Sequence, residues 1–112
     1  MILAISSGGG HWVQLLRLRP AWQDFDVTYA TAHASYVPDL EEEGRPLPPF
    51  HVFPEASRWS KFGLLRQLFA ITWILLRVRP DVVVTTGASA GYFALRVAKY
   101  LGSRTVWVDS IA

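Results

Sequence analysis

Three glycines followed by a histidine form the first stretch whose residue types could do chemistry. The stretch follows the apolar residues 2–6, precedes a helix-like pattern, and consists of Ser7, Gly8, Gly9, Gly10 and His11. A glycine-rich turn between a strand and a helix exposes backbone N–H groups at the positive helix end, and glycine lets an anion approach closely. The stretch indicates a phosphate-binding turn; the alternative is a tight turn that only packs helix against sheet. His11 suits a general base, a phosphate partner or a cap-region residue.

The common nucleotide signatures do not fit this turn. The dinucleotide fingerprint needs a third glycine where Val13 stands, and residues 31–33, after the second expected strand, include no acid for a ribose diol. The triphosphate loop needs a Gly-Lys-Ser/Thr run, which does not follow. The sequence therefore disfavours these nucleotide sites, and we expect no cofactor.

A second turn of small residues follows residues 81–86. Gly87, Ser89 and Gly91 match the G-x-S-x-G pattern of a nucleophile elbow. All three histidines precede Ser89, whereas the usual hydrolase triad needs one after it. A patatin-like pairing of Ser89 with Asp109, with oxyanion donors from the first turn, remains as a hypothesis. The alternative is that the small residues let a helix approach the sheet and line a cleft.

Elements of alternating type must position these turns. The expected strands are residues 2–6, 25–31, 50–53, 81–86 and 104–108, and the expected helices are residues 11–18, 61–78 and 90–101. This alternation predicts a Rossmann-like α/β fold with a parallel sheet, and the apolar runs "VVVTT" and "TVWV" indicate helices on both faces. Residues 32–49, which hold three glutamates and four prolines, are expected to form a surface loop with one short helix at most.

The two turns are expected to share one crevice. Both would lie at the carboxyl ends of strands, where an open parallel sheet binds its ligands. Asp109, at the end of the last expected strand, would look into the same crevice, although a lone carboxylate is equally suited to capping. We interpret the 112 residues as one domain that is truncated after its fifth strand.

Charge and composition narrow the classes of partner. Residues 1–56 carry three Arg against seven acids (−4), and residues 57–112 carry eight Lys or Arg against two Asp (+6). The basic half favours phosphates, anionic lipid or an acidic partner, whereas its scattered charges disfavour nucleic acid. The sequence has no cysteine and no pair of carboxylates or histidines at ligand spacing, so we expect a cytoplasmic protein without disulfides or metal.

The segment 59–79 has the pattern of a helix lying in a lipid headgroup layer. Its middle is apolar, and basic and tryptophan residues stand at or near its ends. The residues suited to membrane contact are Trp59, Lys61, Arg66, Trp73 and Arg77. The alternative is an ordinary crossover helix whose wide apolar face covers the sheet. The longest strongly apolar run, 68–76, is much shorter than the roughly 20 residues of a bilayer span, which excludes a spanning helix.

Two stretches together resemble one family: "ISSGGGHWVQLLRLRP" and "RPDVVVTTGASAGYFALRVAKYLGSRTVWVDSIA". The family is the acceptor-side, membrane-associating subunit of the two-part N-acetylglucosaminyltransferase that extends the dolichol-linked oligosaccharide, with bacterial exopolysaccharide relatives of the PssD type. More distantly, the pattern is similar to the N-terminal domain of the peptidoglycan lipid-intermediate glycosyltransferase.

The resemblance implies the N-terminal half of a GT-B glycosyltransferase, peripheral at the inner face of the cell membrane. A separate donor-binding subunit would bring the UDP-sugar, and a lipid pyrophosphate-linked sugar would be the acceptor. By this carry-over the first glycine turn lies next to the acceptor pyrophosphate or the transfer site, Gly87, Ser89 and Gly91 form the second loop, and Asp109 lines the cleft. The resemblance leaves the base open between His11 and Asp109. The rival hypotheses are the serine hydrolase and a non-catalytic membrane-recruitment module.

Overall fold

The computed structural model describes residues 1–22, 24–41, 46–55 and 60–108. Five strands form one sheet: β1 (Ile2–Ile5), β2 (Val27–Thr31), β3 (Phe50–Val52), β4 (Val82–Thr85) and β5 (Arg104–Trp107). Their order is β3-β2-β1-β4-β5, and every pairing is parallel. The helices are α1 (Gly10–Arg17), α2 (Lys61–Val78) and α3 (Ala88–Tyr100), with short 3-10 segments η1 (Arg19–Ala21) and η2 (Ala34–Leu40). The predicted Rossmann-like α/β fold is confirmed.

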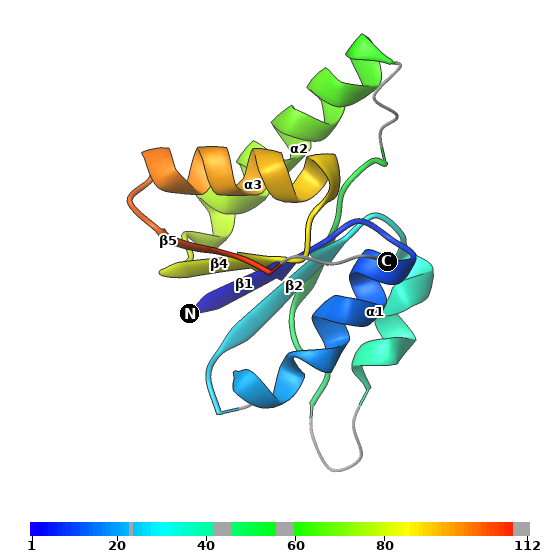
Figure 1. Ribbon diagram of the computed structural model, residues 1–112, viewed down its shortest axis with the longest axis vertical. Helices are drawn as coiled ribbons and strands as arrows, with labels where there is room; N and C mark the ends of the chain where they lie inside the picture. Colours follow the sequence, from blue (N-terminus) through cyan, green and yellow to red (C-terminus); the bar gives the residue numbers. More distant parts are fainter. Residues whose placement is uncertain (23, 42–45, 56–59, 109–112) are drawn as a thin grey trace.

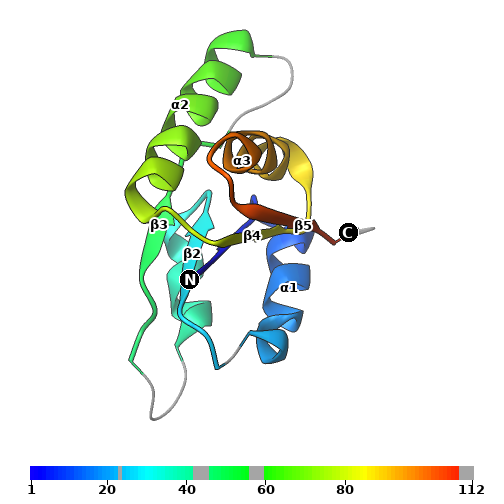
Figure 2. The same cartoon turned by 90° about the vertical axis from the view of Figure 1, so that its left-hand side faces the viewer.

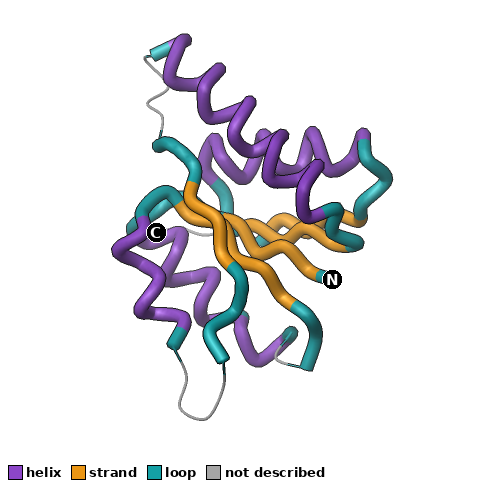
Figure 3. The backbone as a smooth tube through the Cα atoms, turned by 180° about the vertical axis from the view of Figure 1, so that it is seen from behind, coloured by secondary structure: helices purple, strands orange, loops and turns teal. Residues whose placement is uncertain are grey.

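Helices cover both faces of the sheet, with α1 and η2 on one face and α2 and α3 on the other (Figures 1 and 3). The alternation of side chains along β1 divides the core accordingly. Leu3 and Ile5 belong to the cluster that α2 and α3 complete, whereas Ala4 between them belongs to the cluster that α1 completes through Trp12 and Leu15. The sheet is therefore fixed between two apolar layers, and its strand ends have defined positions.

The two central strands create a divergence point at the carboxyl edge of the sheet. β1 and β4 are neighbours, with Ile5 paired to Thr85. After β1 the chain enters α1 on one face and goes on to β2, and after β4 it enters α3 on the other face and goes on to β5 (Figure 1). Connections that diverge from adjacent parallel strands form a topological switch point, where open α/β sheets bind ligands.

The strand β5 departs from expectation. Its apolar sequence predicted burial on both faces, but all four of its residues are exposed, including Val106 and Trp107. β5 is one of the two edge strands of the sheet, so it has a strand neighbour on one side only among the described residues. The apolar pattern correctly predicts a strand, but such a pattern does not distinguish an edge strand from a central one.

The 32–49 segment agrees with expectation, whereas the start of the last helix differs by two residues. Residues 34–40 form η2, the short helix that the sequence allowed for this loop. The helix expected at 90–101 is α3, which begins at Ala88 directly after the second glycine turn.

Among the described residues, no helix combines the length and apolar character needed to cross a bilayer.

The helix α2 ends in an unusual backbone conformation. Arg79 has φ 47° and ψ 62° and is the one non-glycine residue with positive φ among the described residues. Glycine is favoured at this position of a helix end, because the Cβ of an L-residue crowds the following carbonyl in left-handed backbone. Pro80 follows and cannot continue the helix.

Replacing Arg79 by glycine should therefore raise the free energy of unfolding by about 1 kcal/mol, because it removes the crowded Cβ. Urea denaturation measures the change. The matched control is Arg66→Gly in the middle of the exposed face of α2, which should lower the free energy of unfolding by about 1 kcal/mol. If both variants lose stability equally, the left-handed backbone at residue 79 carries no strain.

Candidate functional site

A reciprocal pair of hydrogen bonds joins the two glycine turns. His11 Nδ1 lies 3.1 Å from the carbonyl oxygen of Thr86, and Thr86 Oγ1 donates to the carbonyl oxygen of His11 at 2.6 Å. Thr86 is buried and His11 is half-buried. The start of α1 is thereby fixed against the end of β4, at the switch point of the sheet.

These bonds determine which nitrogen of His11 carries a proton. A carbonyl oxygen only accepts, so the proton is assigned to Nδ1, which donates to Thr86. In the neutral imidazole, Nε2 then keeps its lone pair. No hydrogen bond to Nε2 occurs within the described ranges of the chain. His11 is therefore arranged as a proton acceptor.

At Gly87 the end of a third strand, β5, comes close to His11. A Cβ built on Gly87 would lie 3.4 Å from His11 Cε1 and 3.4 Å from Trp107 Cζ2. Its φ of 122° is a conformation that glycine adopts readily. The structure thus brings His11, Gly87 and Trp107 together at the carboxyl ends of β1, β4 and β5. Trp107 is a site residue that the sequence analysis missed, because its strand pattern suggested burial.

Both helices that begin at this edge start without a side-chain cap in the part of the chain that the structure describes. Their N-cap residues are Gly9, with φ 70°, and Gly87. By contrast, Ser60 Oγ caps α2 by accepting from Gly63 N at 3.1 Å. The first amides of a helix have no intrahelical partner, and the helix dipole favours negative charge beside them. α1 and α3 can therefore both direct amide donors to an anion at this edge.

Tyr36 of η2 is a second residue that the sequence analysis missed. Its hydroxyl accepts a hydrogen bond from Gly9 N at 3.0 Å, and its ring fills the space that a Cβ on Gly8 would need. Trp12 Nε1 donates to Asp39 Oδ2 at 3.1 Å and ties η2 to α1. The residue lies in the segment interpreted as a surface loop, and only its aromatic side chain could have signalled packing.

Ser7 and Gly10 are the remaining predicted residues of the first turn. Ser7 is half-buried, and its carbonyl oxygen accepts from Ser6 Oγ at 2.9 Å. Gly10 is exposed and is the first residue of α1.

Ser89 and Gly91 are engaged in packing. Ser89 Oγ donates to the buried Gln67 Oε1 at 2.9 Å, and Gln67 Nε2 donates to the carbonyl oxygen of Pro54 at 3.2 Å. A Cβ on Gly91 would clash with Thr85 Oγ1, so the glycine lets α3 approach β4 closely. An amide oxygen does not serve as the base that a serine nucleophile needs. These contacts favour the packing interpretation of the G-x-S-x-G pattern over the hydrolase.

Two of the predicted residues, Asp109 and Trp59, lie outside the described residues. The other residues predicted to contact membrane, Lys61, Arg66, Trp73 and Arg77, lie on the exposed face of α2. Within the described ranges, no three His, Cys, Asp or Glu residues gather as metal ligands. His33 and Glu55, at the ends of β2 and β3, form an exposed pair with 3.0 Å between Nε2 and Oε2, a kind of contact that contributes little to stability.

Solved structures of the same fold were found, whereas no family model and no curated protein matches the chain. UDP-GlcNAc 2-epimerase from Methanocaldococcus jannaschii aligns with 96% of the chain at TM-score 0.68 and 20% identity. MurG from Acinetobacter baumannii aligns with 95% at TM-score 0.69 and 14% identity. A glycosyltransferase from Rickettsia africae aligns with 95% at TM-score 0.58 and 14% identity. The chain spans 31%, 33% and 28% of these proteins.

The same fold also occurs as the C-terminal domain of the PF1911 hydrogenase from Pyrococcus furiosus, which aligns with 97% of the chain and 89% of that domain at TM-score 0.64 and 24% identity. The chain thus has a Rossmann-like fold that resembles the N-terminal domain of GT-B glycosyltransferases. Since one fold hosts many activities, the chemistry must be argued from the site itself.

The reciprocal bonds give a spectroscopic prediction. Long-range ¹H–¹⁵N spectra of the neutral His11 imidazole should show the Nδ1–H tautomer, and Thr86→Val should lower the free energy of unfolding by about 1 kcal/mol by removing one bond. Thr72→Val is the matched control, because the Thr72 hydroxyl donates within its own helix, to the Leu68 carbonyl oxygen at 2.7 Å. An Nε2–H tautomer at His11, or equal effects of the two valine variants, would contradict the assignment.

Proposed function

We propose that this domain is the acceptor-binding, membrane-associating half of a split glycosyltransferase. A separate donor-binding subunit would bring a UDP-sugar, such as UDP-N-acetylglucosamine, to a lipid pyrophosphate-linked acceptor held by this half. The observation that carries the proposal is the junction of His11 with Thr86, which unites two uncapped helix starts and a proton acceptor at one switch point. The fold and the sequence resemblance support the same class of enzyme.

His11 fits the chemistry of glycosyl transfer. In this reaction the acceptor hydroxyl attacks the anomeric carbon of the donor sugar, UDP leaves with the bonding electrons, and a base takes the hydroxyl proton. The lone pair on His11 Nε2 would accept this proton, and the resulting positive charge would be stabilised by the Thr86 carbonyl oxygen at Nδ1. Thr86 is then the residue that positions the base.

The helix starts fit the acceptor pyrophosphate. Amide donors at the beginnings of α1 and α3 approach this edge from opposite faces of the sheet, and neither N-cap residue, Gly9 or Gly87, has a side chain that occupies these donors. Two phosphates carry more negative charge than one helix start neutralises, so a pair of helix starts suits a pyrophosphate better than a single phosphate.

The helix α2 divides into an inner and an outer face. Gln67, Ile71, Ile74 and Leu75 are buried. The opposite face carries an apolar row with spacings of three or four residues, which we call the outer stripe: Phe62, Leu65, Phe69, Trp73 and Leu76. Phe62 is 87% exposed and Phe69 71% exposed. A contiguous apolar row of this kind marks an interaction surface.

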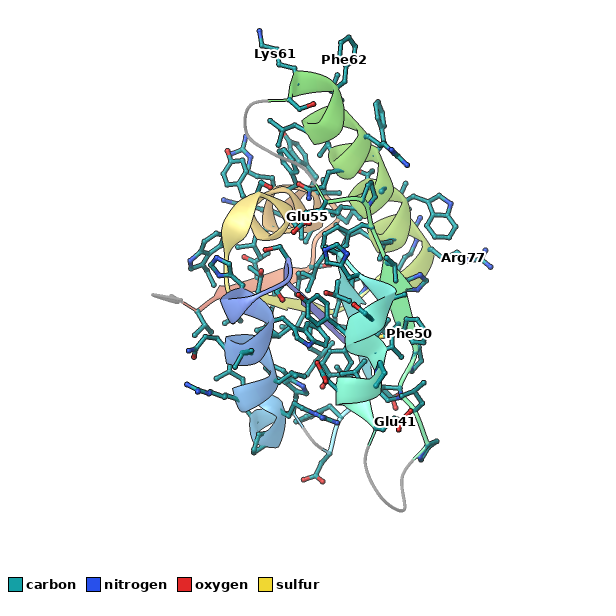
Figure 4. The ribbon with its side chains drawn as sticks, turned by 90° about the vertical axis from the view of Figure 1, so that its right-hand side faces the viewer. Glu41, Phe50, Glu55, Lys61, Phe62 and Arg77 are labelled. Atoms are coloured by element: carbon teal, nitrogen blue, oxygen red, sulfur yellow. The ribbon has the colours of Figure 1, made fainter. Side chains whose placement is uncertain are left out.

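Charge suits the outer stripe to an anionic bilayer surface. α2 contains no acidic residue, and Lys61, Arg66 and Arg77 accompany the stripe. Figure 4 shows Lys61 and Phe62 extending from one end of α2 and Arg77 from the other, away from the body of the domain. Basic residues beside apolar side chains add attraction to anionic lipid, about 1 kcal/mol each near the surface. The crossover-helix and membrane-helix interpretations are thus compatible, one for each face.

A transfer assay tests the catalytic part of the proposal. The chain is used as bait to capture its partner from the source cell, and the complex is given radiolabelled UDP-N-acetylglucosamine and extracted lipid acceptors. His11→Ala should lower kcat by about a hundred- to ten-thousand-fold with a smaller effect on KM, as expected for a lost general base. His33→Gln is the matched control and should leave kcat unchanged. If His11→Ala transfers sugar as well as the original chain and Asp109→Ala does not, Asp109 is the base. If both variants keep full activity in the captured complex, the domain is a non-catalytic recruitment module.

Vesicle binding tests the membrane part. Phe69→Ser and Trp73→Ser should each weaken binding to vesicles of phosphatidylcholine and phosphatidylglycerol by about tenfold, because an aromatic side chain is no longer buried. Tyr100→Ser on α3 is the control, since Tyr100 is equally aromatic, 87% exposed and outside the stripe. Equal affinities for all three variants would exclude the outer stripe as the contact.

A further inference from the structure

A hollow lies at the amino edge of the sheet, opposite the edge that carries the glycine turns. It has a volume of about 520 Å³ and is formed where the α2–β4 and α3–β5 connections meet. These connections are held together by Arg104 N, which donates to the Asp81 carbonyl oxygen at 2.8 Å, and by Ser103 Oγ, which donates to the Pro80 carbonyl oxygen at 2.6 Å. In Figures 1 and 2 they lie side by side at the end of the sheet where the N-terminus is found.

The backbone amides around this hollow already donate hydrogen bonds within the protein. The amides of Arg79, Asp81, Gly102, Ser103 and Arg104 all donate to backbone carbonyl oxygens. Arg79 and Arg104 are among the residues that line the hollow, and neither guanidinium group has a hydrogen-bond or ion-pair partner in the described part of the chain. The donors that remain for a ligand are therefore two guanidinium groups, which suit the oxygens of a phosphate.

The charge of the hollow is positive. Asp81 is its one acidic lining residue, and its carboxylate is paired with the Met1 ammonium group at 2.9 Å. The two arginine charges are thus not neutralised by a carboxylate among the described residues. Two exposed cations that share one concave site attract an anion and repel each other when it is empty.

The backbone of Arg79 is a second, independent indication. Arg79 stands in the left-handed conformation that favours glycine, so its Cβ is strained. Strained residues concentrate at binding sites, where the side chain is needed in one direction. The strain at Arg79 and the unpartnered guanidinium groups point to the same hollow.

We infer that Arg79 and Arg104 form a phosphate-binding site at the amino edge, separate from the proposed acceptor site. The ligand class is a phosphate or pyrophosphate group, either in a lipid headgroup or in a free phosphate-bearing molecule. A lipid source is compatible with the position of Arg79 directly after α2, the helix that carries the outer stripe. The inference does not depend on glycosyl transfer.

The first arm of the test uses inorganic pyrophosphate at constant ionic strength. Amide and guanidinium ¹H–¹⁵N signals of residues 79–82 and 101–104 should shift in a saturable manner. Arg79→Gly should weaken the binding about tenfold, the cost of one lost charge-assisted contact. This variant relieves backbone strain, so its loss of binding does not reflect unfolding. Arg17→Gln, which removes an equal charge at the end of α1, should have no effect.

A gain-of-binding variant strengthens this arm. Asp81→Asn removes the one negative charge of the lining and should tighten pyrophosphate binding severalfold, a result that a damaged fold does not produce. Shifts that rise linearly without saturation, or equal affinities for Arg79→Gly and Arg17→Gln, would overturn the inference.

The second arm identifies the source of the phosphate. Binding is measured to phosphatidylcholine vesicles with and without phosphatidylglycerol. If the site takes a lipid headgroup, Arg79→Gly loses more affinity for the phosphatidylglycerol vesicles than Arg17→Gln does, and pyrophosphate competes. If the site takes a free phosphate-bearing molecule, these two variants bind vesicles equally while the pyrophosphate difference persists. Phe69→Ser tests the outer stripe separately, so a failure of the membrane proposal and a failure of this site give different results.

Discussion

The paired hydrogen bonds between His11 and Thr86 are the contact on which the carboxyl edge of the domain depends. They connect the first turn of α1 with the end of β4 at the point where the chain diverges to opposite faces of the sheet. They join the start of α1 to the residue that precedes Gly87, the N-cap of α3. The bonds also fix the imidazole tautomer, so one local arrangement sets both the spacing of two helix starts and the chemical state of the group between them.

The glycines of the two turns divide into those that make room for a neighbouring side chain and those that stand at a helix N-cap. Gly8 makes room for Tyr36, and Gly91 makes room for Thr85. Gly9 and Gly87 have positive φ and act as N-caps without side chains. Counting glycines therefore overstates the number of residues available to an anion. The donors that an anion would meet at this edge are the uncapped amides that follow Gly9 and Gly87, and the glycine-rich composition itself supplies no further donor.

The fold could be predicted from the sequence because each strand and helix has a local pattern, and a parallel sheet follows from their alternation. The meeting of the two turns also follows, since carboxyl ends of parallel strands share one edge. The contacts that define the site could not be predicted. Tyr36 contacts Gly9 because η2 packs beside α1, and Thr86 contacts His11 because of the register in which β4 pairs with β1. Such contacts depend on tertiary geometry that single residues do not encode, and the exposure of β5 depends on its place at the edge.

The helix α2 connects the carboxyl edge with the surface of the domain. On its inner face the buried Gln67 uses both ends of its amide, accepting from Ser89 at the start of α3 and donating to the Pro54 carbonyl oxygen after β3. Because a buried amide is costly to leave unpaired, α2 is held at a fixed position relative to α3. On its outer face the same helix presents the outer stripe. When a surface binds the outer stripe, the distance and the orientation of the second glycine turn relative to that surface are therefore fixed as well. In a membrane-associated transferase, this rigid link would determine how far a lipid-linked acceptor must extend from the bilayer to reach His11.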